Sequence, residues 1–199
     1  MFDETQSKII NAAMELVMER GYTATTTKDI AGRAGINECT IFRRFKGKKE
    51  IILSAMTLPE WNPCLKKEDF SHIGDLETDL ISFSKMYMKK VTPRMVKVSI
   101  GLRTPELFPE TADGILKVPQ VFKEVLIEYF SEMYRRGKLL NDHFESMAMT
   151  VLSMNFGFVF LSASFGQKLT ELDMEQYITD SVRSFIFGIS KEQMEQYRL

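Results

Sequence analysis

The side chains best suited to chemistry in this 199-residue chain are cations gathered between residues 26 and 49. Seven basic residues there stand against two acidic ones, Asp29 and Glu38, so the stretch carries +5 while the whole chain carries −1. Lysine and arginine neutralise nucleic-acid phosphates, and the arginine guanidinium also matches the O6/N7 edge of guanine. The cluster therefore indicates a nucleic-acid-binding surface. Its members are Lys28, Arg33, Arg43, Arg44, Lys46, Lys48 and Lys49.

Two helices are predicted before the centre of this cluster. The first ends at Arg20, because Gly21 tolerates the left-handed conformation that follows a helix. Thr26 and Asp29 have the spacing of a capping box, which predicts a second helix over about 27–34. The first helix has a buried stripe made of Ile9, Ala13, Leu16 and Val17.

A tight turn then leads into a third helix. Gly35 ends the second helix, and Asn37 is a preferred N-cap for the third. Ile36 precedes the cap and lies one turn from Ile41, which makes a hydrophobic staple. These residues set the angle at which the third helix leaves the turn.

The third helix is predicted to turn its cations outward. Ile41 and Phe45 are four residues apart and point inward, so Thr40, Arg43 and Arg44 share the outward face. The arrangement is a helix-turn-helix, whose third helix is predicted to enter the major groove of duplex DNA. The predicted DNA contacts are Thr26, Thr27, Lys28, Asn37, Glu38, Cys39, Thr40, Phe42, Arg43, Arg44 and Lys48.

This stretch resembles the TetR family of bacterial transcriptional regulators. The resemblance covers roughly the first quarter of the chain and keeps its register across three helices. It implies a dimer, a helical effector-binding domain, and a phosphate-contacting role for Lys48. The matching residues are Ala12, Ala13, Leu16, Glu19, Arg20, Gly21, Tyr22, Ala24, Thr25, Asp29, Ile30, Ala31, Arg33, Ala34, Gly35, Ile36, Thr40, Ile41, Phe42, Phe45, Lys48 and Glu50.

Four residues depart from the usual family pattern. Cys39 stands where glycine is usual, Phe42 where tyrosine is usual, and Arg44 where histidine is frequent. The operator sequence therefore does not follow from that of a relative. Gly47 replaces the common serine or asparagine cap, which predicts a weak start for the fourth helix, over about 48–58.

Composition favours a cytoplasmic globular protein without catalytic machinery. Hydrophobic residues make up 44% of the chain, and the two cysteines, Cys39 and Cys64, are too few for a disulfide framework. Acids soon after Met1 argue against a signal peptide. His72 and His143 lie outside any catalytic motif, and there is no glycine-rich phosphate loop or zinc spacing. We therefore expect no metal, cofactor or enzymatic activity.

The remainder of the chain is predicted to be helical, so the fold class is all-α. We expect a DNA-binding domain over residues 1–50 and an effector-binding and dimerisation domain over 51–199. A mobile connector is predicted over 65–74. Helices are predicted over 75–91, 94–103, 119–136, 142–166 and 174–189, and the breaks between them at Pro93, Pro105, Pro109, Gly114, Gly137 and residues 166–167.

Residues 146–167 carry no charge, a run long enough for a membrane span. Its internal serine, threonine and asparagine residues favour a buried helix instead. With the helix after it, it offers more apolar surface than one core needs, so we expect a two-fold four-helix interface, which the TetR resemblance also implies. The predicted interface residues are Val151, Gly157, Phe158, Leu161, Phe165, Ile178, Val182, Phe185 and Ile186.

Methionine and phenylalanine are abundant, at 13 and 15 residues, and methionine adapts to irregular apolar shapes. Either they pack the core, or together they line a cavity for a lipophilic effector. The predicted pocket residues are Met86, Tyr87, Met95, Arg103, Phe122, Phe130, Met133, Met154, Asn155 and Phe156. Polar groups that would orient the ligand are Asn155, Tyr87, Tyr129, Arg94 or Arg103.

These features predict a homodimeric repressor released from a pseudo-palindromic operator by a small lipophilic effector. One alternative is a DNA-binding interaction protein of the same fold with a non-transcriptional partner, which would occupy many scattered chromosomal sites. Another is a regulator without a small ligand, whose DNA affinity no compound would change.

Overall fold

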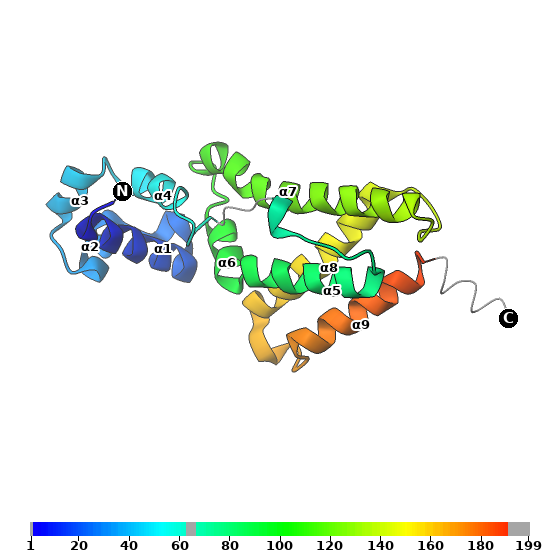
Figure 1. Ribbon diagram of the computed structural model, residues 1–199. Helices are drawn as coiled ribbons and strands as arrows, with labels where there is room; N and C mark the ends of the chain where they lie inside the picture. Colours follow the sequence, from blue (N-terminus) through cyan, green and yellow to red (C-terminus); the bar gives the residue numbers. More distant parts are fainter. Residues whose placement is uncertain (1, 63–66, 191–199) are drawn as a thin grey trace. The chain divides into compact units, whose positions relative to one another are not determined.

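The computed structural model describes residues 2–62 and 67–190, and its regular elements in those ranges are helices (Figure 1). Within them no strand forms beyond an isolated bridge between Leu139 and Ser190. The all-α prediction is confirmed. Cys64 lies outside the described residues. The elements are α1 (Glu4–Ala24), α2 (Thr27–Ala34), α3 (Glu38–Arg44), α4 (Lys48–Ala55), η1 (Lys67–Asp69), α5 (Leu76–Lys90), α6 (Pro93–Gly101), α7 (Phe108–Arg135), α8 (Phe144–Phe165), η2 (Gly166–Lys168) and α9 (Met174–Phe187).

The chain forms two compact units. The first comprises residues 1–64 and 94–117, and the second residues 65–93 and 118–199. The helix-turn-helix therefore packs together with most of α6 and the first turns of α7. The functional division predicted at residue 50 stays a prediction, since packing alone does not test it.

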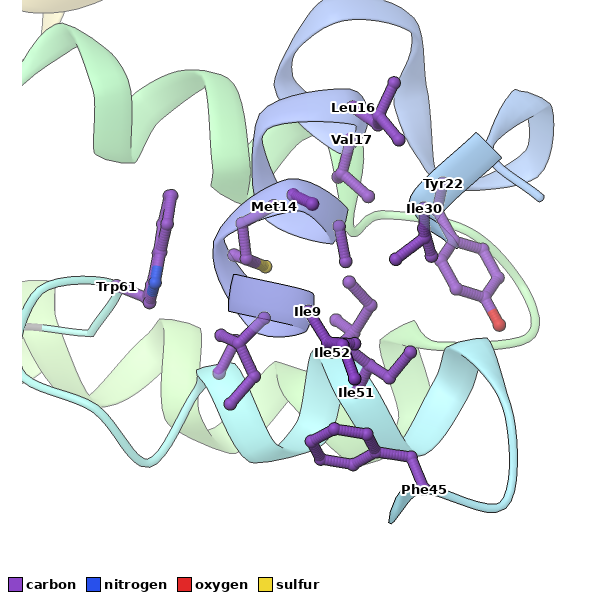
Figure 2. Packing of buried hydrophobic residues seen from close by; sticks show 14 of the residues in the cluster. Ile9, Met14, Leu16, Val17, Tyr22, Ile30, Phe45, Ile51, Ile52 and Trp61 are labelled. Carbon is purple, nitrogen blue, oxygen red and sulfur yellow. The ribbon is translucent and has the colours of Figure 1, made fainter. Parts of the chain in front are cut away.

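The first unit is built around one apolar core, part of which Figure 2 shows. Ile9, Met14 and Val17 of α1 meet Ile51 and Ile52 of α4 in this core, and all five side chains are buried. The core continues into α6 and the turn after it through Val98, Leu102 and Leu107.

Close approach of α6 to α1 depends on Gly101. A Cβ atom at this position would lie 3.0 Å from both the Cγ1 and the carbonyl oxygen of Val17. That spacing is tighter than ordinary packing allows, and one of the two contacts is backbone, which cannot rotate away. Glycine therefore lets the two helix backbones meet.

The second unit pairs α5 with α8 and α9, and α5 lies beside α9 in Figure 1. Arg183 of α9 donates to Glu77 of α5 at 2.8 Å. A buried aromatic cluster joins α5 to α7, where the ring centres of Tyr87 and Phe122 are 4.6 Å apart. Phe83 packs edge-on against Phe122 in the same cluster.

The structure corrects the predicted start of α7. The helix begins at Phe108, so Pro109, Gly114 and Pro119 lie inside it instead of breaking it. Pro109 falls in the first turn, where backbone N–H groups have no helical acceptor and proline costs little. Ile115 is partly buried against the first unit's core, and such packing offsets the cost of the neighbouring glycine.

The segment after η1 is more ordered than the predicted mobile connector. The buried carboxylate of Asp79 accepts the backbone N–H groups of Ile73 and Gly74 at 2.8 and 2.9 Å. It also accepts the Tyr129 hydroxyl at 3.0 Å. One acid on α5 thus holds a loop whose own composition does not predict any order. Residues 65 and 66 lie outside the described ranges.

Candidate DNA-binding interface

The start of α2 is held by the predicted capping box. Thr26 Oγ1 accepts the backbone N–H of Asp29 at 3.1 Å, and the Asp29 carboxylate accepts the Thr26 N–H at 3.1 Å and its hydroxyl at 2.5 Å. Arg20 pairs with the same carboxylate at 2.6 Å. The hydrogen bonds from Thr26, followed by the nearby Arg20, hold the pKa of Asp29 below its usual value. Thr26 is thus engaged in capping.

The turn into α3 also forms as predicted. Gly35 adopts the left-handed conformation with φ of 68°, and Asn37 Oδ1 accepts the Cys39 N–H at 2.8 Å. Thr27 donates its hydroxyl to Glu38 at 2.6 Å, which ties α2 to α3. Thr27 and Glu38, both predicted to contact DNA, therefore bind each other in the free protein.

The outward face of α3 carries an exposed arginine and an exposed ring. Ile41 and Phe45 are buried, while Cys39, Phe42 and Arg43 are exposed, and Phe42 retains 57% of its accessible surface. Thr40 is partly buried. Ile41 and Phe45 fix the helix against the core, so the exposed side chains point in a defined direction although they are not buried.

Arg44 differs from its neighbour because it has a partner. Its guanidinium lies 2.8 Å from Asp3, and both side chains stay partly exposed. Asp3 also caps α1 through the N–H of Gln6. Sequence reasoning overlooked this N-terminal acid; its spacing to Gln6 is the signal that identifies the cap. Such an exposed pair contributes about 0–1 kcal/mol and can exchange its carboxylate for a phosphate.

Lys48 closes the end of α1 instead of projecting freely. Its ammonium donates to the carbonyl oxygens of Tyr22 and Thr25, both at 2.8 Å, and lies 3.8 Å from the centre of the Tyr22 ring. Burial lowers the pKa of Lys48, and nearby Glu106 partly opposes that shift. The Tyr22 hydroxyl donates to Glu106 at 2.6 Å. An ammonium has three donors, so one remains for a phosphate.

Ion pairs neutralise other members of the cationic cluster. Arg33 donates to both carboxylate oxygens of Glu19 at 2.9 Å, and Lys49 pairs with Glu110. Within residues 2–62 and 67–190, three of the seven cations are exposed and have no carboxylate partner, and these offer uncompensated charge. They are Lys28, Arg43 and Lys46.

Comparison with known proteins agrees with this geometry. A sequence model of the family "Bacterial regulatory proteins, tetR family" matches residues 9–55. The HTH-type transcriptional regulator YvkB of Bacillus subtilis is 29% identical over 188 residues, which cover 94% of this chain and 98% of that protein. These matches support a TetR family regulator.

Solved structures show that the TetR-like fold extends over nearly the whole regulator. NalD, the secondary repressor of the MexAB-OprM multidrug efflux pump of Pseudomonas aeruginosa, superposes with a TM-score of 0.69 at 15% identity, covering 95% of this chain and 98% of NalD. FadR of Bacillus subtilis, in complex with stearoyl-CoA, superposes with a TM-score of 0.64 at 19% identity, covering 92% and 98%. At these identities the likeness concerns the fold.

The predicted pocket residues of the regulator do not form a single group. Tyr87, Phe122, Phe130, Met133 and Asn155 are buried in the second unit, and Tyr87 lies against Phe122. The others have different positions. Met86 and Met154 are partly buried, Phe156 is exposed, and Met95 and Arg103 belong to the first unit, where Arg103 is exposed.

Asn155 has hydrogen-bond partners inside the second unit. Its amide nitrogen donates to Ser84 Oγ at 3.1 Å and to the Val151 carbonyl oxygen at 2.9 Å. Both donors of the amide are thus engaged, and its carbonyl oxygen is the group left to orient a ligand.

Four residues predicted to face a partner subunit are instead core residues of the protomer. Val151, Ile178, Val182 and Ile186 retain 3% or less of their accessible surface, so the protomer itself already covers them, and the interface stays a prediction. The spacing of apolar residues in α8 and α9 identified the stripe, but it did not show whether the protomer's own helices or a second copy covers it. The other predicted interface residues keep accessible surface: Leu161 and Phe165 are exposed, and Gly157, Phe158 and Phe185 are partly buried.

Proposed function

We propose that this regulator is a homodimeric repressor that leaves a pseudo-palindromic operator when a small lipophilic effector binds. The observation that carries the proposal is the outward face of α3, where Arg43 is exposed and has no carboxylate partner in the described part of the chain. A side chain that is already paired must break that pair before it reads a base. Arg43 is therefore the better candidate for guanine recognition than Arg44.

Lys28 and Lys46 are proposed as phosphate contacts. Both are exposed, and neither has a carboxylate partner within residues 2–62 and 67–190. Phosphate contacts set the register of a recognition helix without reading sequence. Thr40, Cys39 and Phe42 complete the face toward the bases, and the Phe42 ring suits an apolar contact with a thymine methyl group.

Dimerisation is supported by the surface of α8. The helix is long and apolar enough to cross a membrane by length and composition, yet only 28% of its most apolar 18-residue stretch is buried inside the protomer. A second copy would cover the remaining face. A dimer also has the two recognition helices that an operator with half-sites about 34–36 Å apart requires. The exposed apolar residues of this helix are Met149, Phe156, Leu161 and Phe165.

The proposal of a lipophilic effector draws on both the chain and its structural relatives. The second unit contains a buried aromatic cluster with few polar groups. NalD represses a multidrug efflux pump, and FadR was crystallised with stearoyl-CoA. We propose a lipophilic ligand for this chain too, and a cytoplasmic site of action. We assign DNA binding to residues 1–50, and effector binding and dimerisation to residues 51–199.

Genome-wide mapping of bound DNA tests the proposal. We expect few sites, each a pseudo-palindrome at a promoter, and lower occupancy after exposure to lipophilic compounds that the neighbouring genes handle. Arg43→Ala should abolish the mapped peaks. Lys97→Ala, which removes an exposed cation of α6, is the control and should leave them in place. Numerous scattered sites unrelated to promoters would contradict the repressor and favour a non-transcriptional partner.

A further inference from the structure

A buried indole in the first unit has no hydrogen-bond partner. Trp61 retains 3% of its accessible surface, and its Nε1 is one of two buried side-chain polar atoms without a partner in the described part of the chain; Thr104 Oγ1 is the other. The indole N–H is a donor only, so it needs an acceptor. Buried polar groups in proteins nearly always have one, and an exception calls for an explanation.

The backbone around the indole is held by hydrogen bonds, and the ring itself is buried. The Trp61 backbone N–H donates to the Leu58 carbonyl oxygen at 3.0 Å, and the next residue, Asn62, donates its amide to the Met56 carbonyl oxygen at 3.1 Å. The indole belongs to the apolar core of this unit (Figure 2). A partner for Nε1 must therefore come to the ring.

An arginine covers the same ring. The guanidinium carbon of Arg94 lies 4.0 Å from the ring centre, and Arg94 pairs with no carboxylate among residues 2–62 and 67–190. A cation over an aromatic face keeps its N–H groups available for a further acceptor. The Trp61 ring thus has an unpartnered donor at its edge and a cation over its face.

We propose that Trp61 and Arg94 bind an anionic oxygen group, a carboxylate or a phosphate, at the polar end of an apolar effector. The indole N–H donates one hydrogen bond, and the guanidinium adds charge-assisted donors. The inference rests on the proposed effector response, and it specifies an anionic amphiphile as the ligand.

The chain contains a single tryptophan, so intrinsic fluorescence of the full-length protein reports on this ring. We would titrate decanoate, decyl phosphate and decanol, which share a tail and differ in head group. At least one anion should change the fluorescence saturably and bind about tenfold more tightly than decanol. The anion that binds more tightly shows whether the site prefers a carboxylate or a phosphate head group. Equal binding of decanol, or no saturable response to either anion, would overturn the proposal.

Variants assign the effect to these two side chains. Arg94→Gln should weaken anion binding about tenfold. Lys97→Gln, which removes an exposed cation one turn further along α6, should not. Trp61→Phe keeps an aromatic ring and removes the N–H, so calorimetry should show weaker anion binding. The proposal fails if Arg94→Gln binds the anion as tightly as Lys97→Gln does. It also fails if Trp61→Phe binds the anion unchanged, which is the result expected if a buried water is the partner of Nε1.

Release of operator DNA, measured in parallel by fluorescence anisotropy, separates this inference from the proposed function. If an anion binds through Trp61 and Arg94 but leaves DNA affinity unchanged, the site stands and the proposed release is wrong. If a compound releases DNA equally from the wild-type protein and from both variants, the repressor stands and the Trp61 site is refuted.

Discussion

Replacing Lys48 with methionine is predicted to destabilise the DNA-binding unit itself. The ammonium donates to two carbonyl oxygens at 2.8 Å, those of Tyr22 and Thr25, and lies over the Tyr22 ring. Methionine keeps a flexible stem of similar length but lacks the donors and the charge. The variant therefore removes three contacts that hold the end of α1 to the start of α4.

The size of the effect follows from these contacts. A hydrogen bond from a charged donor contributes roughly 1.5–3 kcal/mol, but Lys48 is partly exposed and water replaces its ammonium, so we take about 1 kcal/mol for each. The cation–π contact adds about 0.5 kcal/mol. Burial lowers the pKa of Lys48, which shows that its charge is partly desolvated and that removing it recovers some free energy. We expect a net loss of about 2 kcal/mol, equivalent to a fall in Tm of roughly 4–8 °C.

Thermal and urea unfolding, followed by circular dichroism, measure this loss. Lys46→Met is the matched control, since Lys46 is exposed and its ammonium has no carboxylate partner in the described ranges; it should stay within about 0.5 kcal/mol of wild type. If Lys48→Met unfolds at the same midpoint as Lys46→Met, the assignment of Lys48 to the end of α1 is wrong.

Four further predictions follow from the same structure. Arg43→Ala should cost about 1–3 kcal/mol per half-site and relax preference at one base pair, and unchanged selection from a randomised operator library would contradict it. Gly101→Ala should lower the free energy of unfolding by about 1–3 kcal/mol, because its Cβ would lie 3.0 Å from two Val17 atoms; urea unfolding midpoints measure this. The pKa of Asp29 is held below 3.8, so its contribution to stability is complete above that pH and is lost as pH falls through the lower folded value; Asp29→Asn should flatten the acid side of a stability titration, and an unchanged slope would refute this. Leu161→Arg should shift the dimer toward monomer in analytical ultracentrifugation, and an intact dimer would show that the exposed surface of α8 is not the interface.

Local hydrogen bonding explains why the helix-turn-helix was predictable. The capping box of Thr26 and Asp29, the left-handed Gly35 and the Asn37 cap all form as expected. Each depends on atoms within a few residues of one another in the chain. Their sequence spacing is therefore nearly their spacing in space, and pattern analysis needs no knowledge of the rest of the fold.

Long-range partners explain why the site was only partly predictable. The 2.8 Å contact of Arg44 with Asp3 spans 41 positions, and Lys48 caps a helix that ends 24 positions earlier, at Ala24. Neither partner is marked by a local pattern. The same reason applies to α7. Pro119 alone predicts a helix start, but the turns before it pack with distant residues of the first unit, and no local pattern indicates that packing.

By itself the sequence determined the all-α class, the helix-turn-helix and the family, because caps, turns and apolar periodicity are local properties. Only the tertiary structure decided which cations remain uncompensated on α3 and its surroundings, and which apolar stripes of α8 and α9 are already buried within the protomer. It also showed that the N–H of Trp61 is buried without an acceptor. Charge compensation, burial and hydrogen-bond satisfaction depend on atoms that are distant in the chain and meet only when it folds.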